Sequence, residues 1–173
     1  MSCEICDLIN GKIKARKLYE DNEVIAFLAP KPAVLGHSIV LPKQHLAIMP
    51  QIPEDVLKKM FFVAQQIAGI IFEAVGAEGT NIMLNEGVAA GQKHAHSMIH
   101  VIPRKKNDGL NFEWPQKQVP EDSMAKIQEL LKVPSEMKVE KAPEMPAEKE
   151  ALKKEGAKTG ARDYLLRHLR RIP

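Results

Sequence analysis

The stretch NEGVAAGQKHAHSMIHVIPR, residues 85–104, joins a glycine-rich loop to an apolar segment and holds three of the six histidines of the chain. In a β-strand, side chains two residues apart share a face. If a strand begins early enough here, His94, His96, Met98 and His100 line one face. A single histidine is usually a structural residue, but a row of imidazoles beside a glycine-rich loop favours an anion or metal site.

Short apolar runs bounded by turn residues predict β-strands on both sides of the loop. Two strands are expected within 17–28, with a turn at Asp21-Asn22. Further strands are expected at 37–41, at 80–84 and at 96–102. Adjacent strands with one long helix on a face are typical of an α+β layer and not of alternating βαβ units.

One long amphipathic helix is predicted from Pro53 to Val75. Pro53 and the two acidic residues after it are a start signal, and Gly76 is a stop signal. The apolar positions have the spacing that buries one helix face: Val56, Leu57, Met60, Phe61, Ala64, Ile67, Ala68 and Ile71. A second, shorter helix is predicted over 121–131.

The composition is that of a soluble protein, with 45% hydrophobic and 27% charged residues among 173. No apolar run reaches the roughly 18 residues that a membrane span needs, so no membrane partner is expected. Residues 1–10 lack the features of a signal peptide, which favours a cytoplasmic protein. The net charge of +3 is too small to indicate a nucleic-acid partner by itself.

We expect one domain over 1–133 and an extension over 134–173. The extension begins as a linker rich in Pro, Lys and Glu with few large apolar residues. It ends in a short basic amphipathic helix over Ala161–Ile172, in which arginines alternate with apolar residues. This helix must dock either on its own domain or dimer mate, which is the simpler alternative, or on a partner protein.

The histidine-rich stretch resembles the signature of the histidine triad (HIT) superfamily. In that pattern Gly91-Gln92 is followed, after three residues, by His96-x-Met98-x-His100 and Ile102-Pro103-Arg104. Further blocks match in order over residues 3 to about 110: Cys3-x-x-Cys6, Tyr19-Glu20-Asp21, Gly36-His37-x-x-Val40-x-Pro42-Lys43-x-His45 and Asn85-x-Gly87.

The resemblance implies a five-stranded antiparallel sheet with a long helix, usually in a homodimer. It implies a pocket for a purine nucleoside phosphate, in which His96 and His100 flank the position of a nucleophilic histidine. That histidine attacks the α-phosphate, as a neutral imidazole can. The phosphate oxygens would be held by groups around the glycine-rich loop: Asn85, Gly91, Gln92 and Lys93.

Three residues depart from the family pattern. Met98 stands at the nucleophile position, and a thioether carries no proton for acid–base work. Ala29 replaces an aspartate that contacts the ribose in many members, and Lys93 replaces a serine that faces the phosphate. These changes favour a nucleotide-binding protein without hydrolytic activity.

Two alternatives stay open beside that hypothesis. The first is a hydrolase or transferase acting on the α-phosphate of nucleoside phosphoramidates or dinucleoside polyphosphates. The second is that Met98 is an engineered substitution, although Ala29 and Lys93 favour a diverged natural branch. Reading His94 as a triad member would need a bulge in the strand, so the gap-free alignment is preferred.

The two cysteines, three residues apart, indicate half a metal site or a redox pair in a reducing compartment. Zinc takes four thiolate and imidazole ligands. The resemblance implies a structural zinc ion bound by Cys3, Cys6, His45 and His96. The simpler alternative is a pair of free thiols near a flexible terminus.

Overall fold

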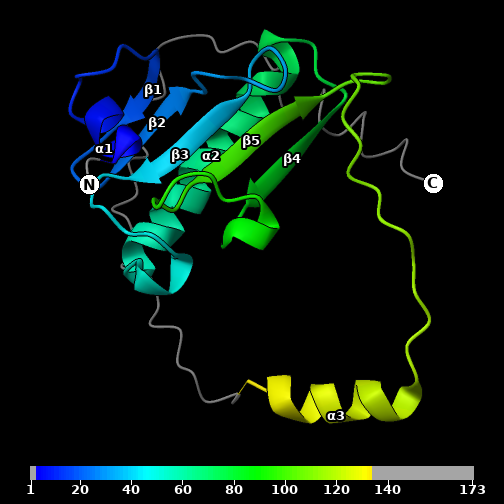
Figure 1. Cartoon of the computed structure of the whole chain (residues 1–173). Helices are drawn as coiled ribbons and strands as arrows, with labels where there is room; N and C mark the ends of the chain where they lie inside the picture. Colours follow the sequence, from blue (N-terminus) through cyan, green and yellow to red (C-terminus); the bar gives the residue numbers. More distant parts are fainter. Residues whose placement is uncertain (1–2, 134–173) are drawn as a thin grey trace, which may run out of the picture. The chain divides into compact units, whose positions relative to one another are not determined.

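Five antiparallel strands form one sheet in the order β1-β2-β3-β5-β4 (Figure 1). Their bounds are β1 (Lys17–Glu20), β2 (Val24–Leu28), β3 (Ser38–Pro42), β4 (Gly79–Leu84) and β5 (Ile99–Arg104). The computed structural model describes residues 3–133. The expected helix over Ala161–Ile172 and the linker before it lie outside the described residues. The predicted α+β class and the five-stranded antiparallel sheet are confirmed.

A carboxylate fixes the turn between β1 and β2. Asp21 Oδ1 accepts the backbone N–H groups of Glu23 at 2.8 Å and of Val24 at 2.7 Å. Burial by itself would raise the pKa of Asp21, but these N–H groups, Tyr19 and Lys59 lower it to about 2. The predicted turn at Asp21-Asn22 is therefore confirmed, and its cause is a local side-chain cap.

Helices cover both faces of the sheet. The long helix α2 (Glu54–Ala74) packs on one face, where its buried residues meet Val24, Val40 and Val101. The short helix α1 (Glu4–Ile9) places Ile5 and Leu8 on the other face, against Ile25, Phe27, Ile39 and Leu41. Residues of β2 and β3 alternate between these two clusters, so apolar side chains from both strands are buried on both faces of the sheet. Two 3₁₀ helices lie in the connections, η1 (Met49–Gln51) and η2 (Val88–Ala90).

The long helix was predicted almost to its ends, but one edge of its apolar face was placed wrongly. Phe61 was expected in the buried stripe and is 45% exposed, whereas Val63 is buried. At the edge of a helical stripe, only the packed neighbour decides which side chain is covered.

The last strand begins later than predicted. The alternation from His96 predicted a strand over 96–102, but β5 begins at Ile99. Of the four side chains expected on one strand face, only His100 therefore lies on the strand. The others belong to the connection from η2 to β5.

The chain divides after Asp108 into two units. Within the second unit, α3 (Glu121–Leu131) has the predicted bounds and no buried residue. The predicted domain over 1–133 stays a prediction, because its boundary adjoins residues outside the described part. No helix within residues 3–133 is long and apolar enough to cross a membrane.

Candidate functional site

Two histidines meet on the sheet face opposite α2. His100 lies in β5, beside Ile39 of β3, and His37 immediately precedes β3. His37 Nε2 is 3.1 Å from His100 Nδ1, and the ring centroids are 5.3 Å apart. On the far side of the His37 ring, Nδ1 accepts the backbone N–H of Ala33 at 3.0 Å. Antiparallel pairing of β3 with β5 thus joins residues 63 positions apart.

This chain of hydrogen bonds assigns both tautomers. In a neutral imidazole one nitrogen donates and the other accepts. Because His37 Nδ1 accepts from Ala33, the proton of His37 lies on Nε2 and is donated to His100 Nδ1. His100 then carries its own proton on Nε2. Burial, and then the neighbouring His100, lower the pKa of His37 to about 4, and burial lowers that of His100. Both rings are neutral at pH 7.

Met98 and Ala29 adjoin the same apolar surface. Both are partly buried and pack against the cluster formed by Ile5, Leu8, Ile25, Phe27, Ile39 and Leu41. Met98 and Ala29 therefore extend an apolar surface on the side of the sheet where His100 lies. A thioether there contributes packing and polarizability, without a proton to give or take.

The predicted metal ligands come together from three parts of the chain. Cys3 and Cys6 lie at the beginning of α1, His45 follows β3, and His96 precedes β5. One ligand atom from each lies within 4.8 Å of all the others. Cys6 Sγ is 3.2 Å from His45 Nδ1 and 3.8 Å from His96 Nδ1, and Cys3 Sγ is 4.0 Å from His96 Nδ1.

The fully buried His96 is oriented by a backbone carbonyl. Its Nε2 lies 2.9 Å from the oxygen of Pro42 and donates a hydrogen bond to it. Nδ1 is left unprotonated and faces the two sulfur atoms, which is how histidine ligands of metals are commonly held. Burial, followed by the neighbouring Cys3 and Asp7, raises the pKa of Cys6, which argues against a reactive thiol.

The glycine-rich loop is tied to the segment after β3. The Gln92 carboxamide donates to the oxygen of Ala47 and accepts the N–H of Gly87, both at 2.8 Å. Gly87 and Gly91 have φ of 81° and 88°, where a side chain would be strained. Asn85 Nδ2 lies 3.8 Å from the position that a Cβ on Gly91 would occupy.

Lys93 is exposed, and His94 Nδ1 lies 3.6 Å from Glu4 Oε2 of α1.

Two groups of the site were not predicted from the sequence, namely the His37 side chain and the carbonyl of Pro42. A second histidine just before a buried strand was the available signal for His37. No residue pattern indicates a carbonyl contact.

Comparison with known proteins gives concordant matches. The family model described as HIT domain matches residues 10–107. Adenylylsulfatase HINT3 of Arabidopsis thaliana is 37% identical over 108 residues, which cover 62% of this chain and 55% of that protein. Adenosine 5'-monophosphoramidase HNT1 of Candida albicans is 32% identical over 136 residues, covering 76% of this chain and 90% of the relative. A crystal structure of a Zn-bound histidine triad family protein from Mycobacterium smegmatis superposes with a TM-score of 0.60 at 35% identity, covering 68% of this chain and 85% of that one.

Proposed function

This chain belongs to the HIT domain family, and we propose that it binds a purine nucleoside phosphate without hydrolysing it. The observation that carries the proposal is the hydrogen bond from His37 Nε2 to His100 Nδ1, taken together with Met98, which the resemblance aligns with the nucleophile position. Neither side chain offers a free nitrogen lone pair to phosphorus. His100 Nε2–H is instead a neutral donor suited to a phosphate oxygen.

The loop around η2 supports phosphate binding through its backbone more than through Gln92. Both ends of the Gln92 carboxamide are bonded to the backbone, so this side chain holds the loop in shape. We propose that Asn85, Lys93 and the N–H groups near Gly91 contact the phosphate, with His96 and His100 beside them. A lysine would add the positive charge that the neutral imidazoles lack.

The alternative function is a hydrolase or transferase acting on nucleoside phosphoramidates or dinucleoside polyphosphates. Two relatives, an adenylylsulfatase and an adenosine 5'-monophosphoramidase, favour it. In this chain the nucleophile would have to be His94 or His100. His100 would first have to lose the proton on Nε2 or its bond with His37.

Turnover by three proteins tests the two functions: the unaltered chain, Met98→His and Met98→Leu. We expect the unaltered chain to bind AMP. We also expect that it does not hydrolyse adenosine phosphoramidate or diadenosine tetraphosphate. Activity should appear in Met98→His only. Met98→Leu controls for packing, because leucine keeps the apolar contact. Hydrolysis by both the unaltered chain and Met98→Leu would overturn the binding proposal.

We also propose a structural zinc ion at Cys3, Cys6, His45 and His96. The donor set suits zinc, and the orientation of His96 leaves its Nδ1 facing the two thiols. Four protein ligands leave no open position, so the ion would hold α1 to the sheet. We expect about one zinc per chain by elemental analysis and a lower Tm after chelation. A chelator-treated protein with unchanged Tm would contradict this role.

We propose that the chain is a cytoplasmic homodimer. Phe62 and Ile70 are 55% and 64% exposed, and lie eight residues apart on one face of α2. Ile82, 44% exposed, lies on the edge strand β4, whose free backbone groups favour pairing with another strand. Two cysteines that form no disulfide fit a reducing compartment.

A further inference from the structure

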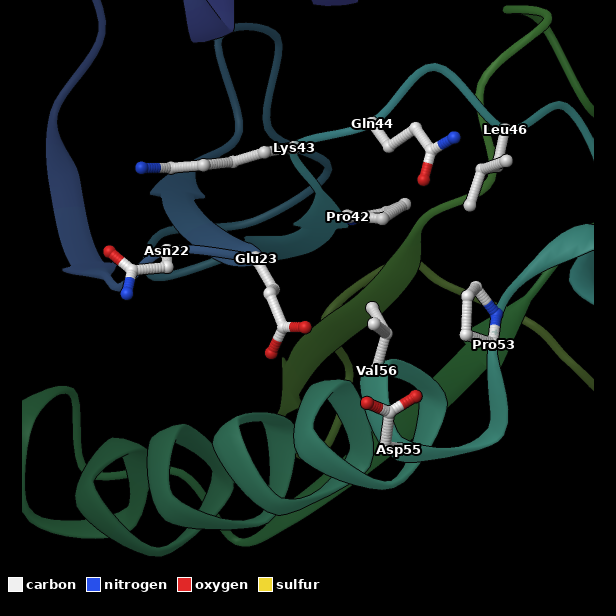
Figure 2. Close-up of a pocket in the computed structure, with 9 residues that line it drawn as sticks. All are labelled: Asn22, Glu23, Pro42, Lys43, Gln44, Leu46, Pro53, Asp55 and Val56. Carbon is white, nitrogen blue, oxygen red and sulfur yellow. The ribbon is translucent and has the colours of Figure 1, made fainter.

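A cavity of about 260 Å³ lies between the first turn of α2 and the ends of β2 and β3 (Figure 2). None of its lining residues is a proposed zinc ligand or phosphate contact, although the Pro42 carbonyl orients His96. The lining residues are Asn22, Glu23, Pro42, Lys43, Gln44, Leu46, Pro53, Asp55 and Val56. The volume is at or below the small end of the range for drug-sized ligands. It suits one long side chain better than a nucleotide.

The walls of the cavity divide into an apolar part and an acidic part. Pro42, Leu46 and Val56 provide apolar surface, and Glu23 and Asp55 extend their carboxylates around it (Figure 2). Among the described residues, no ion pair involves Asp55, and only one oxygen of Glu23 bonds to Lys59. This combination fits a side chain with an aliphatic stem and a cationic head.

Lys43, which lines the cavity, does not pair with Asp55. Lys43 Nζ forms an ion pair with Glu20 at 2.7 Å, and Figure 2 shows its side chain extending away from Asp55. An anionic ligand would therefore meet the carboxylate of Asp55, while the lysines nearest the cavity, Lys43 and Lys59, are already paired with Glu20 and Glu23. A guanidinium is the better match, because its planar fork pairs with carboxylates and its weak hydration favours partial burial.

We propose that an arginine of the chain's own C-terminal segment, residues 161–173, inserts into this cavity. That segment combines Arg162, Arg167, Arg170 and Arg171 with apolar residues that can cover the rim. Residues 134–160 could span up to about 90 Å, enough to reach any part of a domain of this size. Tethering also raises the local concentration of the arginines far above that of a separate molecule.

The test uses isotope-labelled full-length chain and amide NMR spectra. Changing the four arginines to glutamine should shift the amide resonances of Glu23, Gln44 and Val56. Asp55→Asn should move the resonances of 161–173 toward their positions in the four-arginine variant. Glu54→Gln is the matched control, because it removes a carboxylate from the same helix turn outside the cavity, and should leave the segment unchanged. Raising NaCl from 0.1 to 1 M should weaken the effect.

Two outcomes would overturn the proposal. Cavity amides that do not respond to the four-arginine variant would show that the segment does not occupy the cavity. Shifts that grow with protein concentration would assign the arginine to a second copy of the chain. The four-arginine variant alters no residue of the described domain, so this comparison remains decisive even if Asp55→Asn fails to fold.

Discussion

His37 is held neutral by burial and by its contact with His100, which lower its pKa from the ordinary 6.5 to about 4. Between these two pH values the unfolded chain binds a proton on His37 that the folded chain does not. The free energy of unfolding therefore falls as the pH is lowered from about 6.5 to about 4. One such group contributes a limiting slope of about 1.4 kcal/mol per pH unit.

Denaturant titrations at several pH values between 4.5 and 6.5 measure this slope. His37→Asn should be less stable at pH 7, because the bonds to Ala33 and His100 are lost, and its stability should fall less steeply with acidification. An unchanged slope would show that His37 is not the group responsible. Asp21 does not affect the slope in this window. Its pKa is lowered from 3.8 to about 2, so the stability that it contributes is lost only as the pH falls between these two values.

At the scale of elements, the turn before β3 depends on a glycine that no side chain can replace. Gly36 has φ of 88°, and a Cβ there would lie 3.2 Å from Val75 Cγ1 and 3.3 Å from Pro103 Cγ. Gly36→Ala should cost about 1 kcal/mol for the backbone and at least about 1 kcal/mol more for overpacking. Gly11→Ala is the control, with φ of 76° and open space. Equal losses in denaturant melts would remove the packing argument.

The start of β5 shows what a sequence period cannot reveal. The alternation of side chains continues back to His96, but within the described part of the chain residues 96–98 have no neighbouring strand with which to form ladder hydrogen bonds. Ser97 N–H donates to the oxygen of Leu46, which follows β3, and the His96 side chain donates to the oxygen of Pro42, the last residue of β3, so neither bond belongs to a strand ladder. The side-chain pattern predicted the strand, and the available backbone partners decided where it begins.

The helix α1 was not predicted from the sequence. Without it, a pair of free thiols on a flexible terminus stayed open as an alternative to the metal site. Six residues are too few for a period to be recognised. The resemblance supplied the four ligands, but the alternative of thiols on a flexible terminus assumed no local structure. Ile5 and Leu8 dock on the sheet and hold both cysteines beside His96.

For the whole molecule, strand order is the property that the sequence left open, because the family resemblance implied a five-stranded antiparallel sheet but not the order β1-β2-β3-β5-β4. Placing β5 between β3 and β4 brings His100 beside His37. The same order brings His96 within reach of Cys3, which is 93 residues away. Strands, the long helix and the glycine-rich loop could be located from local signals. A contact such as that between His37 and His100 depends on which strands are neighbours.

The exposed face of α2 and the edge strand β4 lead to the last prediction, which concerns assembly. In a two-fold symmetric dimer, each residue near the axis meets the matching surface of the partner. Ile70→Lys would place an ammonium group of each copy in an apolar interface, at a cost of several kcal/mol. We expect the dimer dissociation constant to rise about 100-fold or more in sedimentation experiments. Leu35→Lys is the control, because Leu35 is 83% exposed in the connection between β2 and β3. A dimer that tolerates Ile70→Lys as well as Leu35→Lys would place the interface elsewhere, because a lysine costs little only where water can still reach it.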